Sequence, residues 1–186
     1  GCSSDEVFVT VNVTFGPPAQ VAGDFTVCPG EAAVLQASGG DTYLWSLNNF
    51  TNPSITIPNI TNDTTVWVIA YDANGCPGDT TFVTINPWEE PQANFTSPTQ
   101  CEGAVTNFSD NSTLTEGTIV AWEWDFGDGS GGSTNQNPSH TYTASGPFTV
   151  TLTVTSSTGC QSTMTQNIVV EPVPDADFTF ANVCEG

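Results

Sequence analysis

Two segments, WEWDFGDG at residues 122–129 and FTVTLTV at residues 148–154, carry the strongest structural signal in the sequence. In an extended strand alternate side chains share a face, so Trp122, Trp124 and Phe126 point the same way, toward a core or its margin. The second stretch alternates threonine with aliphatic residues, which predicts one wet face and one buried face. Asp128-Gly129 is a tight-turn signal, because glycine tolerates positive φ. These patterns predict β-strands joined by short turns.

The composition of the whole chain agrees with that local pattern. Threonine occurs 29 times among 186 residues, and β-branched and aromatic residues favour strands. No apolar run approaches the ~20 residues that a membrane-spanning helix needs. We therefore expect an all-β protein of tandem sandwiches and no membrane span.

The charge of the chain excludes several classes of partner. The chain has twenty carboxylates and no lysine or arginine, which gives a formal net charge of −20. Nucleic-acid binding is excluded because no basic side chain can neutralise phosphates, and an anionic membrane surface repels the chain for the same reason. A surface of this sign attracts cations such as Ca²⁺, which oxygen ligands bind.

Six cysteines reveal a repeat of about 75–85 residues. One class follows glycine and precedes a strand-like run: Cys2, Cys76 and Cys160. The other class precedes x-Gly: Cys28, Cys101 and Cys184. Cysteines without metal-type spacing indicate disulfides and an oxidising, extracellular setting. The phase of the repeat predicts Cys28–Cys76 and Cys101–Cys160 bonds, with Cys2 and Cys184 bonded to neighbouring repeats; a Cys2–Cys184 bond is the alternative.

Proline-containing linkers divide the chain into repeats. Residues 1–14 read as the last strand of a preceding repeat, 19–87 and 92–171 as two whole sandwiches, and 175–186 as the start of a following repeat. Short apolar runs between turn residues predict the strands. The expected strands are 33–37, 43–46, 54–57, 66–71, 82–85, 105–110, 119–125, 148–155 and 164–170.

The second repeat closely resembles the PKD (polycystic kidney disease) domain. The resemblance rests on residues 107–112, the stretch 122–129, NPSHTY at 137–142, Gly146 and the stretch 148–154. It implies a β-sandwich in which His140, the only histidine, has a structural hydrogen-bonding role. General-base chemistry needs a positioned base with an orienting partner, so we expect no enzyme.

The first repeat resembles the Ig-like repeats of large secreted surface proteins of Bacteroidota. The matching segments are 28–30, 38–41, 43–46, 54–56 and 72–76. Those proteins alternate such repeats with PKD domains, and many are exported by type IX secretion or serve gliding motility. Trp45 is the expected core tryptophan between the sheets.

Two weaker signals concern the surface. Asp125 and Asp128 serve the turn, and they are also the candidate ligands for Ca²⁺, although the spacing of a calcium-binding loop is absent. Asp63-Thr64-Thr65 and Asp79-Thr80-Thr81 are similar to the Bacteroidota O-glycosylation motif, which would place sugar on Thr64 and Thr80.

The sequence thus predicts a spacer segment of a secreted cell-surface fibre or adhesin, whose partners are neighbouring repeats and, at the surface, a polysaccharide or protein. One alternative is an accessory binding module of a secreted polymer-degrading enzyme, in which Trp122, Trp88 or Tyr142 would form an exposed aromatic strip. Another is a surface-layer subunit. Buried aromatic side chains favour the fibre, and exposed ones favour the binding module.

Overall fold

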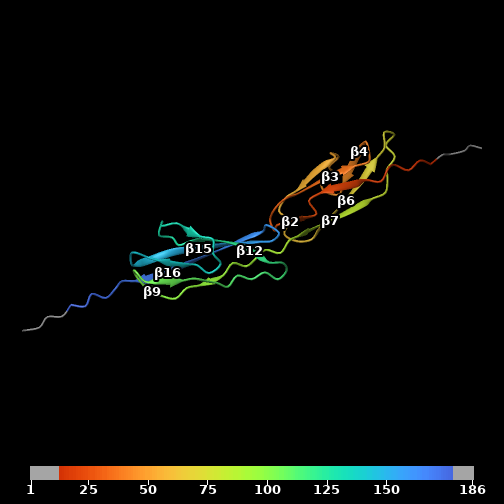
Figure 1. The fold of residues 1–186 in the computed structure, drawn as a ribbon. Helices are drawn as coiled ribbons and strands as arrows, with labels where there is room; N and C mark the ends of the chain where they lie inside the picture. The colour runs from red at the N-terminus through yellow and green to blue at the C-terminus, as the bar shows by residue number, and fades with distance from the viewer. Residues whose placement is uncertain (1–12, 178–186) are drawn as a thin grey trace, which may run out of the picture. The chain divides into compact units, whose positions relative to one another are not determined.

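The computed structural model describes residues 13–177, and every regular element within them is a β-strand. The chain forms two compact units whose boundary lies between Trp88 and Glu89 (Figure 1). The expected all-β sandwich architecture is confirmed. Within the described range no helix is long and apolar enough to cross a membrane. The predicted flanking repeats at 1–14 and 175–186 lie largely outside that range, and their described residues form no strand.

The first unit has a three-stranded and a four-stranded sheet. The first contains β1 (Gln20–Gly23), β3 (Ala33–Ser38) and β5 (Ser54–Ile57), in the order β1-β3-β5. The second, in the order β2-β7-β6-β4, contains β2 (Thr26–Val27), β4 (Thr42–Trp45), β6 (Thr64–Tyr71) and β7 (Thr81–Pro87). All neighbours pair antiparallel except β2 and β7, which are parallel.

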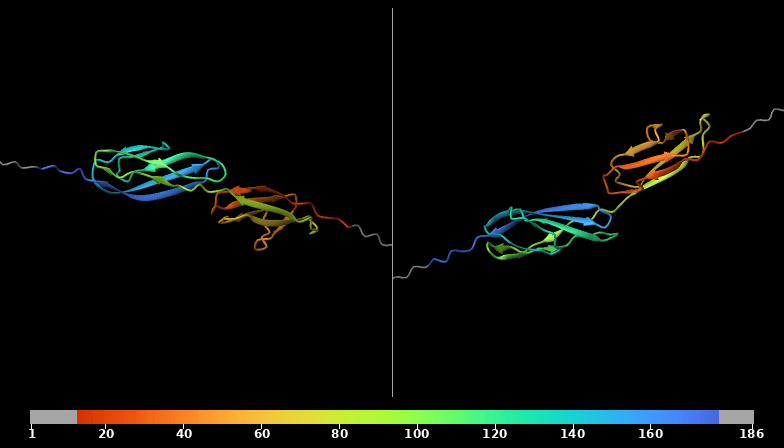
Figure 2. Two further views of the ribbon diagram at one scale, coloured as in Figure 1. Left: turned by 90° about the horizontal axis from the view of Figure 1, so that it is seen from below. Right: turned by 45° about the horizontal axis from the view of Figure 1, so that its top comes forward.

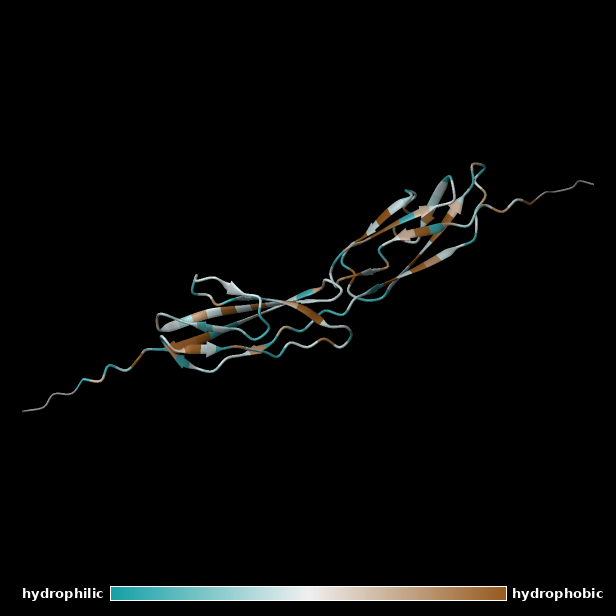
Figure 3. Cartoon of the chain, in the orientation of Figure 1, coloured by the Kyte–Doolittle hydropathy of each residue, from teal (hydrophilic) through white to brown (hydrophobic). Residues whose placement is uncertain are grey.

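Alternating hydropathy builds the core of the first unit (Figure 3). In β3, Ala33, Leu35 and Ala37 are buried while the residues between them are exposed. Trp45 is fully buried, as expected, and its indole N–H donates to the carbonyl of Asn52 at 3.0 Å. A buried indole needs such a partner, because an unpaired donor costs about 1–3 kcal/mol.

The second unit has one large sheet and two short ladders. The sheet, in the order β13-β12-β15-β16-β9, contains β9 (Gln100–Cys101), β12 (Ile119–Asp125), β13 (Gly132–Ser133), β15 (Gly146–Ser156) and β16 (Gln161–Glu171). The ladders join β8 (Phe95–Thr96) to β11 (Ser109–Asp110) and β10 (Val105–Asn107) to β14 (Ser139–Thr141).

Each unit receives the chain at one end and releases it at the other (Figure 2). In the first unit, Gly16 N–H donates to Pro77 O before β7 begins, and Trp88 N–H donates to Val27 O after β7 ends. In the second, Ala93 N–H donates to Ser162 Oγ near the start of β16, and β16 ends beside β9. We call these ends the entry pole and the exit pole of a unit.

The expected strands are present with two differences. The expected strand 105–110 is divided into β10 and β11 at Phe108, because the two segments pair with different partners, β14 and β8. The hairpin of β15 and β16 extends beyond the expected 148–155 and 164–170, since its ladder continues to the connecting turn. The short β1, β2, β8, β9, β13 and β14 were not expected.

Candidate functional sites: cysteine turns and a tryptophan pocket

The two described cysteines of the first unit lie at opposite poles. Cys28 follows β2 at the exit pole, where β2 pairs with the end of β7, and Cys76 precedes β7 at the entry pole. The seven residues of β7 span roughly 20 Å, whereas a disulfide needs Cα atoms within about 7 Å. The expected Cys28–Cys76 bond is therefore not formed, and Cys76 is a free thiol.

The second unit repeats this arrangement. Cys101 pairs with Glu171 at the end of β16, and Cys160 directly precedes β16. The eleven residues of that strand span roughly 35 Å, so the expected Cys101–Cys160 bond is not formed either, and Cys101 is a free, exposed thiol. Cys28 and Cys160 are both disulfide-bonded. The expected bonds of Cys2 and Cys184 lie outside the described residues.

Cys28 and Cys101 occupy the same kind of turn. Glu31 N–H donates to Cys28 O at 3.0 Å, and Ala104 N–H donates to Cys101 O at 3.1 Å. The third residue of each turn is a glycine with φ of 83° or 78°, which is the conformation that a type II turn requires. We call these two turns the C-x-G turns.

Cys76 and Cys160 also have the same environment. In the Asp72–Cys76 turn, Gly75 N–H donates to Asp72 O, Asp72 N–H donates to Cys76 O, and Cys76 N–H donates to Asp72 Oδ1 at 2.8 Å. The turn ending at Cys160 has the same three hydrogen bonds, with Ser156 replacing Asp72 and its Oγ accepting from Cys160 N–H at 3.1 Å. The Cys76 N–H hydrogen bond is the main cause of the lowered pKa of the Asp72 carboxyl. We call these the G-C turns.

The only histidine has a structural position. His140 Nε2 lies 2.7 Å from Asp128 Oδ2, its ring stacks on Phe126 at 4.1 Å, and it contacts Tyr142 edge-on at 4.7 Å. Burial raises the pKa of the Asp128 carboxyl, but hydrogen bonds from Ser130 and His140 outweigh burial and lower this pKa to about 2. The carboxylate is ionised at neutral pH, so Nε2 carries the proton and donates it.

Tyr142 is buried and closes the same cluster. Its hydroxyl donates to Phe126 O at 3.1 Å, and its ring stacks on Phe148 at 4.4 Å. Burial, with smaller effects from the Asp128 and Asp125 charges, raises the pKa of this phenol well above its ordinary value. The buried phenol and the histidine bonded to a carboxylate hold this turn in place.

The turn uses the carboxylates that were candidates for calcium. Asp125 Oδ1 accepts from Gly127 N–H at 2.9 Å, and Asp128 Oδ1 accepts from Ser130 N–H and Oγ at 3.0 and 2.7 Å. Across residues 13–177, no three His, Cys, Asp or Glu side chains are grouped as metal ligands. A calcium site at Asp125 and Asp128 remains a prediction.

The two threonines that are candidates for glycosylation lie in the first unit. Thr64 donates to Asn62 O, and Thr80 is exposed in the loop before β7. Glycosylation of either residue remains a prediction.

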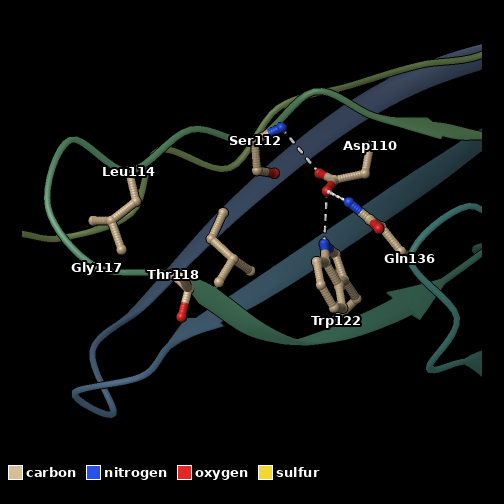
Figure 4. Close-up of a pocket in the computed structure, with 8 residues that line it drawn as sticks. Asp110, Ser112, Leu114, Gly117, Thr118, Trp122 and Gln136 are labelled. Carbon is tan, nitrogen blue, oxygen red and sulfur yellow. Dashed lines mark hydrogen bonds between the residues drawn. The ribbon is translucent and has the colours of Figure 1, made fainter.

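A pocket in the second unit lies beside Trp122 (Figure 4). Asp110 Oδ2 accepts from Trp122 Nε1 at 2.7 Å and from Gln136 Nε2 at 3.1 Å, while Oδ1 accepts from Ser112 N–H at 2.9 Å. The pocket is a shallow hollow of about 430 Å³ whose apolar wall includes Leu114. The sequence did not indicate this cluster, because Asp110 and Gln136 are distant in sequence and meet only through the strand pairing.

The binding-module alternative requires an exposed aromatic strip formed by Trp122, Trp88 or Tyr142, and Tyr142 does not contribute to one. Tyr142 is 1% exposed, Trp122 is half-buried against the core, and Trp88 is 42% exposed. Trp124 and Phe126 are buried in the core, as their alternation predicted.

Comparisons with known proteins identify the second unit. The family model of the PKD domain matches residues 88–171, and none of the curated proteins matches the chain. The PKD1 domain of Epp from Vibrio anguillarum is 36% identical, over 45% of this chain and 96% of that domain, with a TM-score of 0.43. The PKD1 domain of the metalloprotease PrtV from Vibrio cholerae is 38% identical, over 44% of this chain and 98% of that domain, with a TM-score of 0.40.

A third structure, from work on carbohydrate-binding modules of the β-sandwich superfamily, is 32% identical over 45% of this chain and 35% of that chain, with a TM-score of 0.43. PKD domains are generally non-catalytic, and together with a disulfide bond they indicate an extracellular structural or binding segment. Through residues 88–171, this chain belongs to the PKD domain family.

Proposed function

We propose that this chain is a spacer segment that bears tension in a long secreted cell-surface fibre or adhesin. The surface proteins of Bacteroidota that its first repeat resembles supply the context, including type IX secretion and a role in attachment or gliding. The function of such a segment is mechanical: the units keep their length under force.

One observation carries the proposal: the first and last parts of each unit run parallel between opposite poles. In the first unit, β2 pairs in parallel with the end of β7, through Asn86 N–H to Phe25 O at 2.9 Å and Trp88 N–H to Val27 O at 2.8 Å. A pull on the chain ends draws β2 toward the entry pole and β7 toward the exit pole. The bonds between these strands are then loaded together in shear, and do not open one after another.

The second unit has the same parallel pairing of its first and last segments. β9 pairs in parallel with the end of β16, and Glu102 N–H donates to Glu171 O at 2.9 Å. Before β16 can extend, its ladder with β15, the longest in the described chain, must also be broken. Both units thus suit a segment that transmits tension along the chain.

Single-molecule pulling on the full chain under reducing conditions tests the proposal. We expect one unfolding event for each unit, and about 25 nm of released chain for a unit of about 80 residues. Asn86→Pro removes the N–H that bonds Phe25 O, so it should lower the unfolding force of the first unit alone. Ala73→Pro is the matched control, at a turn position that accepts proline. If the two variants unfold at the same force, the shear mechanism is wrong.

The Trp122 pocket favours a second candidate, a polysaccharide-binding module. An indole face beside a carboxylate and an amide fits the apolar face and the hydroxyl groups of a sugar. Calorimetry with soluble chitin and cellulose oligosaccharides tests it. Binding that is lost in Trp122→Ala and kept in Trp88→Ala would support this candidate, and absence of binding by the unsubstituted chain to these oligosaccharides would count against it.

A further inference from the structure

The cysteine turns supply an inference beyond the spacer role. Each turn type occurs once in each unit, with matching hydrogen bonds and glycine geometry. In each type one cysteine is disulfide-bonded and the other is a free thiol: Cys28 and Cys101 in the C-x-G turns, Cys160 and Cys76 in the G-C turns. Both turn types therefore hold a cysteine in a geometry that a disulfide accepts.

We propose that Cys101 and Cys76 form disulfide bonds with adjacent repeats of the same fibre. Cys101 bonds the G-C turn of the repeat that follows the second unit, and Cys76 bonds the C-x-G turn of the repeat that precedes the first. This inference rests on the proposed function in one respect, because it requires adjacent repeats of the same kind. It replaces the pairing within a unit that the sequence predicted.

The positions of the cysteines exclude a bond within one unit and set the direction of the bonds. The two turn types lie at opposite ends of the last strand of each unit, β7 or β16, far beyond disulfide reach. Cys101 lies at the exit pole, beside the chain that leads onward, and Cys76 lies at the entry pole. Because the chain leaves a unit at its exit pole, the entry pole of the following repeat is the part of that repeat that comes first along the chain after Cys101.

The surroundings of both thiols suit bond formation. Cys101 is exposed, and its backbone is fixed by its own turn and by Glu102 N–H bonding Glu171 O. Cys76 is half-buried, held through Asp72, with Thr14 Oγ1 3.8 Å from its sulfur. A fixed backbone reduces the conformational entropy lost when the bond closes.

The bond forms by thiol–disulfide exchange with a protein disulfide donor of the oxidising compartment. The Cys101 thiolate attacks the donor disulfide, which forms a mixed disulfide and releases one donor thiolate. The partner thiolate of the next repeat then attacks the Cys101 sulfur and releases the second. Two protein thiols lose two electrons and two protons, and the donor leaves as a dithiol.

Disulfide mapping of the full secreted protein tests the proposal. Free thiols are alkylated before unfolding, and the unreduced protein is cut with a protease specific for acidic residues, because the chain has no lysine or arginine for trypsin. We expect Cys76 and Cys101 to escape alkylation. Each should appear in a linked peptide pair with a cysteine of the other turn type from an adjacent repeat. Alkylation of either residue, or a link between cysteines of the same type, would overturn the proposal.

A Cys101→Ser variant identifies the partner directly. It should release one thiol per chain, from none to one, and that thiol should lie in a G-C turn; Thr99→Ser is the control and should release none. If no new thiol appears in the variant, the proposal is wrong. If the variant is not secreted, the disulfide mapping of the unsubstituted protein is the test. The pulling experiment is made under reducing conditions, so its result does not depend on these bonds. The proposed spacer function can therefore fail while the disulfides are found, and the disulfides can be missing while the spacer function holds.

Discussion

The two units keep the same ends and differ in their cores. Two aromatic side chains, Tyr43 and Trp45, are buried in the first unit among alanines and branched aliphatic residues. The second unit buries five aromatic side chains: Phe95, Phe108, Trp124, Phe126 and Tyr142. The first four are connected by ring contacts, and Tyr142 joins them through His140. Both units nevertheless have parallel pairing of their first and last segments and one turn of each cysteine type.

The contrast between the two cores separates the features that the architecture requires from those that can vary. A sandwich core tolerates different side chains as long as the volume is filled, so aliphatic and aromatic packing both serve. The entry and exit poles of a unit tolerate less variation in sequence, because a disulfide accepts only a narrow range of distances and angles. Under the proposed pairing of Cys76 and Cys101, the shared turns are the features that join one repeat to the next.

The largest effect should come from removing the central tryptophan of each core. Trp45→Ala and Trp124→Ala should each destabilise their own unit by about 3–5 kcal/mol. The loss should be greater for Trp124, whose ring meets Phe95 at 5.2 Å and Phe108 at 5.5 Å, since each such pair adds about 0.5–1.5 kcal/mol.

Urea unfolding followed by NMR signals assigned to each unit measures the two losses separately. Trp88→Ala, at an exposed position, is the control and should change stability by less than about 0.5 kcal/mol. Equal losses for Trp45→Ala and Trp124→Ala would mean that the aromatic cluster adds nothing beyond its buried area.

The fold could largely be predicted from the sequence, since alternation along β3, β6, β12 and β15 fixes which side chains are buried. The role of His140 was also predictable, because the only histidine lies in a motif typical of PKD domains. The cysteine pairing was not. The phase of the repeat shows which cysteines are equivalent. The distance between the two cysteines of one unit depends instead on the length of β7 or β16, which separates them. The direction in which a strand runs has no local signal in the sequence. The same holds for the Asp110 cluster, which long-range pairing assembles.

The next largest effect should come from acid, which should destabilise the second unit through Asp128. Its pKa is lowered from 3.8 to about 2 in the folded unit. A carboxyl with a depressed pKa stabilises the fold above its unfolded pKa, and this contribution is lost as the pH falls from about 4 to 2. Because solvent screens a carboxylate near the surface, the loss amounts to about 1 kcal/mol. Stability of the second unit, measured by urea unfolding at a series of pH values, should decline accordingly.

Asp128→Asn separates this effect from the other carboxylates. The variant should be less stable than the unsubstituted chain at pH 7 and converge with it toward pH 2, while the first unit responds identically in both proteins. If the difference between the two proteins does not change with pH, the His140 and Ser130 hydrogen bonds do not stabilise the ionised form.

The smallest effect concerns the outer faces, where the units are alike. Thr65 and Thr84 face each other across β6 and β7 with hydroxyl oxygens 2.9 Å apart, and Thr153 and Thr163 do so across β15 and β16 at 3.0 Å. Double-mutant cycles to alanine should give a coupling energy of about 0.2–1 kcal/mol for each pair. The two values should agree within a few tenths, because neither pair contacts its core.

The Thr151–Thr165 pair, at 3.4 Å, is the internal reference and should couple more weakly than Thr153–Thr163 in the same hairpin. A coupling much larger in the second unit than in the first would show that the aromatic core also stiffens the outer face of its sheet. Equal couplings would confine the difference between the units to their interiors. The exposed faces and the ends would then be interchangeable between the two units, whatever the composition of their cores.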